Sequence, residues 1–100
     1  MLIQRWQATI LPNESQIQQI LLSEGLEPSL EIFPKGQKIQ EHRHPYTEIR
    51  VVASGQLTLN ISGNQLLLRE GDRIEIPANT KHSYFNNYVD DCICIFAFRL

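Results

Sequence analysis

The three histidines and one of the glutamates in this chain are spaced as metal ligands. His42 and His44 are two residues apart, Glu48 follows four residues later, and His82 lies in a separate segment. Residues two apart on an extended strand project from the same face, so one strand would present both His42 and His44. Three imidazoles and one carboxylate form a site for one divalent transition metal ion, and Fe, Mn, Ni, Cu and Zn all suit that ligand set.

Glu48 cannot lie on the same straight strand as the histidine pair. Four residues beyond His44 would place it ~13 Å away, at ~3.3 Å per residue. Pro45 breaks the strand, so we expect Glu48 to return on the neighbouring strand, and the loop 77–81 to bring His82 from the other sheet. Such a site leaves about two of six octahedral positions open to water or substrate.

The alternative interpretation is an exposed loop. A His-Arg-His run beside a proline is a weak signal when taken alone, and Glu48 would then be a surface residue of a strand. The joint pattern of histidines, glutamate, glycines and a second block around His82 favours the metal site.

Further side chains are candidates for contact with a small-molecule substrate. Arg50 has the same strand parity as Glu48, so it projects toward the same cavity. It would either bind a carboxylate or enolate group of a substrate, or form an internal ion pair with Glu48 or another acid, and the ion pair is favoured. Tyr46 and Tyr84 are the other candidates, although aromatic residues in a β-barrel are more often part of the core.

Composition excludes several classes of function. The chain has 100 residues and a formal net charge of -2, without the cationic run that binds nucleic acid. No apolar stretch approaches the ~20 residues of a membrane span, and the N-terminus does not resemble a secretion signal. Cys92 and Cys94 are expected to be buried and poorly placed to bridge each other. These features predict a cytoplasmic location.

The first part of the chain, residues 1–28, is predicted to form an arm and a helix. Residues 1–10 alternate only partly and suit a short strand or an extended arm. The helix is expected over 13–25, with Asn13 as N-cap, Gln16 as its capping-box partner and Gly25 just past the end. We expect it to cover one side or one end of a sheet.

Residues 29–100 are predicted to form a single β-barrel. Short alternating segments separated by turn residues are typical of an all-β sandwich or barrel. Gly63-Asn64 suits a two-residue hairpin turn. The segment 92–98 is apolar on both faces, so one face would line the core and the other would meet the N-terminal segment or a second subunit. The expected strands cover 29–33, 37–44, 47–53, 56–62, 65–69, 73–76, 82–86 and 92–98.

Two blocks of the sequence resemble the signature motifs of the cupin superfamily. The first, Gly-x5-His-x-His-x3-Glu-x6-Gly, is matched by Gly36, His42, His44, Glu48 and Gly55. The second, Gly-x5-Pro-x-Gly-x2-His-x3-Asn, is matched by Gly71, Pro77, His82 and Asn86. Asn79 stands where the second motif has glycine, and asparagine tolerates the left-handed backbone that such a turn requires.

The resemblance implies a double-stranded β-helix, a jelly-roll-like barrel with the metal inside. It assigns His42, His44, Glu48 and His82 as the ligands, and Asn86 only as a motif position. It suggests a metal-dependent dioxygenase, decarboxylase or isomerase that acts on a small polar molecule. The alternative is a non-catalytic module that binds or senses a small molecule, because fold alone does not fix function.

We also expect a homodimer. The apolar segment 92–98 and the arm 1–10 together offer more apolar surface than a small barrel alone would cover.

Overall fold

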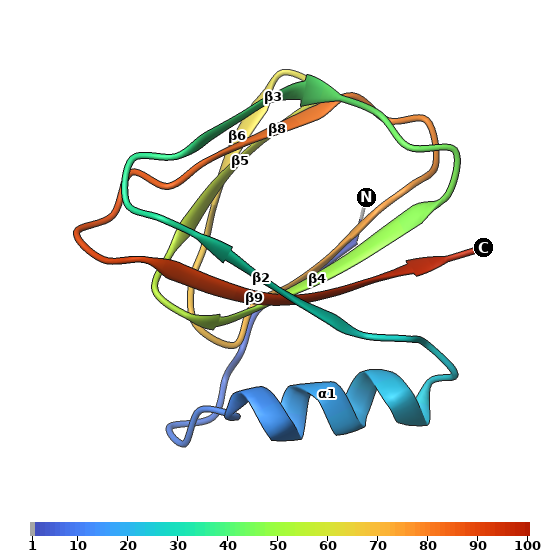
Figure 1. The fold of residues 1–100 in the computed structure, drawn as a ribbon, viewed down its shortest axis with the longest axis vertical. Coiled ribbons are helices and arrows are strands. Elements are labelled where there is room, and N and C mark those ends of the chain that lie inside the picture. Colours follow the sequence, from blue (N-terminus) through green and yellow to red (C-terminus); the bar gives the residue numbers. More distant parts are fainter. Residues whose placement is uncertain (1) are drawn as a thin grey trace.

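The computed structural model describes residues 2–100, which fold into two facing antiparallel sheets and one helix (Figure 1). One sheet has the order β1-β7-β4-β9-β2 and the other has the order β3-β8-β5-β6. The expectation of an all-β, jelly-roll-like barrel with one short helix is therefore confirmed. The strands are β1 (Leu2–Gln4), β2 (Ser29–Phe33), β3 (Lys38–His42), β4 (Thr47–Ser54), β5 (Leu57–Ile61), β6 (Asn64–Leu68), β7 (Arg73–Ile76), β8 (His82–Phe85) and β9 (Cys92–Arg99).

The helix α1 (Glu14–Ser23) begins and ends as its capping residues predict. The side chain of Asn13 accepts from the backbone of Gln16, and the side chain of Gln16 accepts from the backbone of Asn13. Gly25 follows the helix with a φ of 81°, a backbone conformation that glycine adopts without steric cost. Within residues 2–100, no helix is long and apolar enough to cross a membrane.

Strands β4 and β9 pair with each other inside the five-stranded sheet, and β9 is apolar on both faces, whereas the inner face of β4 carries Glu48 and Arg50. On the outer face, Ile49, Val51 and Ile95 pack against Ile17 and Leu21 of the helix. Figure 1 shows α1 lying along this outer side of the sheet. On the inner face, Val52, Cys92 and Cys94 join the core between the two sheets. The apolar segment around β9 thus meets the N-terminal helix of its own chain.

The N-terminal arm is held on the edge of the five-stranded sheet by one buried carboxylate. Strand β1 pairs with β7. Asp72, only 2% exposed, accepts from the backbone of Trp6 at 3.0 Å, from the backbone of Arg69 at 2.9 Å and from the side chain of Arg5 at 2.6 Å. Met1 of the expected arm lies outside the described residues.

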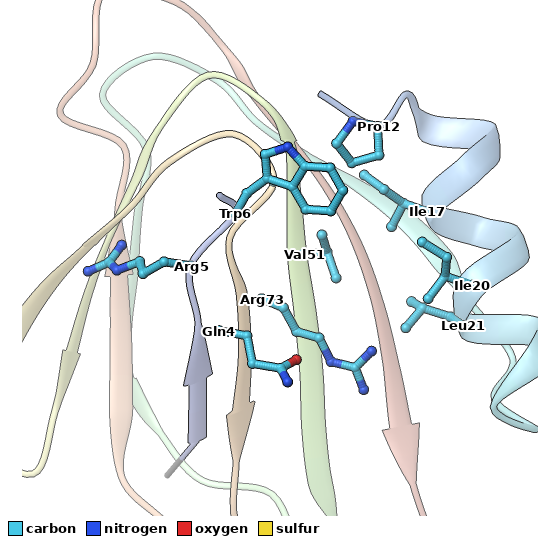
Figure 2. Close-up of a pocket in the computed structure, with 10 residues that line it drawn as sticks. Gln4, Arg5, Trp6, Pro12, Ile17, Ile20, Leu21, Val51 and Arg73 are labelled. Atoms are coloured by element: carbon cyan, nitrogen blue, oxygen red, sulfur yellow. The ribbon is translucent and has the colours of Figure 1, made fainter. Parts of the chain in front are cut away.

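A groove of about 180 Å³ separates this arm from the helix. Figure 2 shows the ring of Trp6 beside Pro12 and Ile17, with Val51 on the floor between arm and helix. Its lining is mostly apolar and includes no histidine or cysteine. The histidines predicted as metal ligands therefore lie elsewhere, between the two sheets.

Several expected boundaries differ from the structure by one or two residues. The two-residue hairpin turn is Ser62-Gly63, with φ values of 49° and 78°, and Ile61 pairs directly with Asn64. Two consecutive positive φ values are what a type I′ turn requires, so the turn lies one residue earlier than predicted. Cys92 and Cys94 are buried free thiols, as expected, with their sulfur atoms 3.8 Å apart.

Candidate metal centre

The four expected ligands converge at one end of the barrel interior. One ligand atom from each of His42, His44, Glu48 and His82 lies within 4.8 Å of the others. His42 ends β3 and His82 begins β8, Glu48 projects inward from β4, and His44 lies in the connection between β3 and β4. The four side chains whose spacing in the sequence predicted a cluster therefore do lie together in the structure.

The routes by which these side chains reach the site differ from three of our expectations. His82 was expected from the other sheet, but β8 pairs directly with β3, so His42 and His82 share one sheet. Glu48 was expected on a neighbouring strand, but β4 belongs to the opposite sheet. His44 does not share a strand with His42, because β3 ends at His42 and the chain then crosses between the sheets. Pro45 lies in that crossing, between the end of β3 at His42 and the start of β4 at Thr47.

A bulge in β3 turns His42 into the barrel. Ile39 pairs with Tyr84 and His42 pairs with His82. Between these two pairs, β3 advances by three residues and β8 by only two, so β3 contains one extra residue. Ile39 already faces the core. Three residues beyond Ile39, strict alternation would point His42 outward. The bulge absorbs the extra residue and so returns His42 to the inner face.

Backbone carbonyls fix the orientation of two of the imidazoles. The Nδ1 atom of His42 lies 2.8 Å from the carbonyl oxygen of Gln40, and the Nδ1 atom of His82 lies 2.9 Å from that of Thr80. A carbonyl oxygen only accepts, so each Nδ1 carries a proton and donates it. In the neutral ring the Nε2 lone pair is then free to bind a metal.

The carboxylate of Glu48 is buried and ionised. Burial opposes its ionisation, but the nearby His82, the charge of Arg50 and hydrogen bonds from Tyr84 and Arg50 outweigh this and lower the Glu48 pKa to about 2. Burial lowers the pKa of His44, with partial opposition from Glu48. Burial also acts to lower the pKa of His82, but its interactions with Glu48 and the Thr80 carbonyl outweigh this, so that pKa is raised.

The residues present fit a metal ion. Within the described chain, the Nε2 atom of His82 is buried and makes no hydrogen bond. It lies 3.6 Å from Oε1 of Glu48, while Nε2 of His44 lies 3.3 Å from the same oxygen. A buried polar atom without a partner is costly, and a cation among these lone pairs would satisfy it. Imidazole nitrogen with one carboxylate is the donor set of first-row transition metals.

A pocket of about 280 Å³ opens beside this cluster. Arg50 lines it, as its strand parity with Glu48 predicts, and Tyr84 lines it too, although both side chains are almost fully buried. Tyr46 is not among the lining residues and instead stacks on the ring of His44, with a centroid separation of 5.8 Å. The lining residues are Glu31, Phe33, Ile39, His42, His44, Glu48, Arg50, Tyr84, Phe96 and Phe98.

The residue that the sequence analysis missed is Glu31 on β2. Its Oε1 atom lies 2.9 Å from Nη1 of Arg50, at the pocket. Glu31 and the buried Phe33 are two apart on one strand, so their shared face was a signal available in the sequence. That Glu31 would pair with Arg50, on a strand distant in the sequence, could not be predicted from residue spacing.

Two motif positions support the site through the backbone and the loops. Asn79 has a φ of 62°, the left-handed conformation expected for it, and its N–H donates to the carbonyl oxygen of His44 at 2.6 Å. Asn86 is fully buried and donates to the carbonyl oxygens of Phe33 and Asp90. Asn86 therefore ties strand ends together and does not face the metal cluster.

The chain is similar to known proteins, both over most of its barrel and over shorter segments. A family model described as a cupin domain matches residues 29–98. Quercetin 2,3-dioxygenase from Bacillus subtilis is 44% identical over 52 residues, which cover 51% of this chain and 15% of that protein. Acireductone dioxygenase from Alcanivorax borkumensis is 44% identical over 48 residues, which cover 44% of this chain and 26% of that protein. The chain thus spans only a minor part of the length of these relatives.

Among solved structures, a predicted oxalate decarboxylase from Thermotoga maritima is similar with a TM-score of 0.69. The two chains are 18% identical, and the match covers 83% of this chain and 73% of the other. At this level of identity the likeness shows a shared fold.

Proposed function

The chain belongs to the cupin family, and on that premise we propose that it is a metal-dependent enzyme acting on a small polar metabolite. The observation that carries this proposal is the cluster of three imidazoles and one carboxylate beside a pocket of about 280 Å³. The reaction types considered are those of a dioxygenase, a decarboxylase or an isomerase. The two dioxygenases among the relatives support the first of these.

His42, His44, Glu48 and His82 would hold one divalent ion, and Fe, Mn, Ni, Cu and Zn all suit the set. A metal bound there would supply a Lewis-acid or oxygen-activating centre. The residues around it would bind and orient the substrate, and the aromatic walls formed by Phe96 and Phe98 would exclude water.

Contact between substrate and the three expected side chains stays a prediction. Arg50 and Tyr84 already direct polar atoms at Glu48, so a substrate would meet the remaining edge of the guanidinium group and the ring of Tyr84. Tyr46 would contact a substrate only at the outer side of His44, against which it stacks.

The experiment that tests the function combines metal analysis with turnover. We would measure the metal content of the wild type, His42→Ala and His82→Ala, with the exposed Asn60→Ala as the control. Near-stoichiometric metal in the wild type and the control, and its loss from both histidine variants, is the expected result. Wild-type protein that stays metal-free after incubation with Fe, Mn, Ni, Cu and Zn salts would contradict the metal site.

Turnover separates the enzyme from the binding module. Oxygen uptake by the metal-loaded protein would be followed with quercetin and with an acireductone as probes, because the relatives carry those names. Uptake that is lost in His82→Ala supports a dioxygenase. Saturable binding of small polar ligands without turnover, across dioxygenase, decarboxylase and isomerase assays, would favour the non-catalytic module.

We also propose that the chain forms a homodimer, although through a different surface from the one first expected. Strand β9 is central in its sheet and covered by α1, so it offers no edge. Strand β2 is an edge strand whose Leu30 and Ile32 are 44% and 50% exposed. An apolar edge of this kind is suited to a second copy of the chain. The cytoplasmic location and the absence of nucleic-acid and membrane partners stay predictions.

A further inference from the structure

The two carboxylate oxygens of Glu48 have different surroundings. Oε2 accepts a hydrogen bond from the hydroxyl of Tyr84 and another from Nε of Arg50, at 3.0 Å. Oε1 accepts neither of these bonds and instead faces the imidazoles, 3.3 Å from Nε2 of His44 and 3.6 Å from Nε2 of His82. One oxygen is thus fully engaged by donors, and the other points toward the site of the cation.

The two donors are themselves held in place. The guanidinium carbon of Arg50 lies 5.3, 4.8 and 4.9 Å from the ring centroids of Phe33, Tyr84 and Phe96. Its Nη1 atom is paired with Glu31 at 2.9 Å, and its side chain is 4% exposed. Cation–π contacts, together with an ion pair to the half-exposed Glu31, restrict rotation of such a group. Nε of Arg50 also lies 3.2 Å from the Tyr84 hydroxyl, so the two donors support each other.

A glutamate can bind a metal through one oxygen or through both. We propose that Arg50 and Tyr84 are positioning residues that confine Glu48 to binding the metal through Oε1 alone. This inference rests on the proposed metal site. With Oε2 engaged by two donors, Glu48 occupies one coordination position, and the position that a second oxygen would take stays free for water or substrate.

A purely structural role for this cluster predicts something different. If Arg50 and Tyr84 served only to neutralise and solvate a buried carboxylate, their removal would lower stability and leave the number of coordination positions unchanged. The number of water molecules bound to the metal therefore distinguishes the two roles. Mn²⁺ is a suitable probe, because the relaxation rate of water protons reports how many water molecules it binds.

The experiment compares wild-type protein with Tyr84→Phe and Arg50→Lys, each loaded with Mn²⁺ and checked for folding by circular dichroism. Tyr84→Phe removes the hydroxyl donor and keeps the ring, and Arg50→Lys keeps the charge and removes Nε. Tyr46→Phe is the matched control, because it removes a hydroxyl from a ring that stacks on His44 and forms no hydrogen bond to Glu48 within the described residues. Using two independent variants allows one of them to fail to fold without losing the test.

We expect the number of bound water molecules to fall by about one in Tyr84→Phe and in Arg50→Lys, because the freed Oε2 takes a coordination position. Tyr46→Phe should match the wild type. An unchanged number in variants that fold and bind Mn²⁺ would overturn the positioning role, and so would a folded Tyr84→Phe variant that no longer binds Mn²⁺. Wild-type protein that binds no Mn²⁺, nor any of the other four metals, would instead overturn the proposed metal site, and the positioning role with it.

Discussion

His42 and His82 are direct partners across the antiparallel pair β3–β8, with ring centroids 4.3 Å apart. The bulge between Ile39 and His42 makes this pairing possible, because it reverses the parity of the last residues of β3. The bulge thus accommodates one extra residue in β3 while His42 stays opposite His82.

Deletion of Glu41 should therefore remove the bulge and keep the metal site. Without the extra residue, His42 would lie two positions after Ile39, so regular alternation would point both side chains into the barrel, and Mn²⁺ or Zn²⁺ should bind within about ten-fold of the wild-type affinity. Glu41→Ala, which keeps the residue count and the bulge, is the control and should bind like the wild type. Titration calorimetry of both variants, beside circular dichroism, measures this. An affinity more than about ten-fold weaker in the deletion variant alone would show that the bulge itself is needed to position His42.

Asn79 should tolerate glycine and resist alanine. Its φ of 62° costs an alanine about 1–2 kcal/mol, while glycine adopts this conformation freely. We expect the free energy of unfolding to fall by about 1 kcal/mol in Asn79→Ala and to change by no more than about 0.5 kcal/mol in Asn79→Gly. Urea denaturation measures both values. A drop of equal size in the two variants would mean that the asparagine side chain, and not the backbone, stabilises the turn.

The clustering of His42, His44, Glu48 and His82 could be predicted from the sequence, because their spacing matches the two cupin motifs. Strand alternation likewise placed Arg50 on the same face as Glu48, and the ion pair between them, favoured in the sequence analysis, is present at 3.0 Å. The capping residues predicted where the helix begins and ends. Each of these features depends on local spacing, which a sequence states directly.

What the sequence could not predict depends on contacts between distant strands. The sheet to which Glu48 and His82 belong is decided by which strands pair, and alternation is the same in either sheet. The bulge in β3 could not be predicted from a glycine, because the strand contains none. The ion pair of Arg50 with Glu31 joins β4 to β2 across the intervening β9. These long-range choices are set by packing of the whole barrel.

Gly71 should be essential for docking of the N-terminal arm. A Cβ atom at this position would lie 2.6 Å from Cβ and Cγ of Trp6, so Gly71→Ala would push the arm away. Trp6 is the only tryptophan, and we expect its fluorescence to shift to the red. Gly36→Ala is the matched control, because its φ of 83° imposes the same backbone strain but its added Cβ would meet nothing within 4 Å. A red shift of the same size in the control would refute a steric cause.

The edge strand β2 offers the test of the proposed dimer. Ile32→Lys places a charge on this exposed apolar edge, and charges on edge strands oppose pairing with a second sheet. We expect light scattering to report a dimer for the wild type and a monomer for this variant. Leu67→Lys, at a similarly exposed position of the other sheet, should remain a dimer. A wild type that is monomeric at high concentration would contradict the proposal.

Asp72 should make docking of the arm depend on pH. Burial acts to raise the pKa of this carboxyl, but hydrogen bonds from the backbones of Arg69 and Trp6 and the charged side chain of Arg5 outweigh it, so the pKa is lowered from its ordinary value. A group whose pKa is lower in the folded state stabilises the fold above its unfolded pKa of about 3.9. That contribution is lost as the pH falls through the still lower folded value.

Comparison of the wild type with Asp72→Asn isolates this contribution from that of other carboxyls. Hydrogen bonds to a charged group contribute about 1.5–3 kcal/mol each, but the amide oxygen of Asp72→Asn can still accept some of them. We therefore expect the wild type to be more stable at pH 7 by about 1–2 kcal/mol. The difference should stay constant down to about pH 5 and shrink toward zero below about pH 4. Urea denaturation followed by Trp6 fluorescence measures it at each pH. A difference that persists undiminished at pH 2.5 would show that Asp72 acts through its shape and neutral hydrogen bonds, and that its charge does not hold the arm.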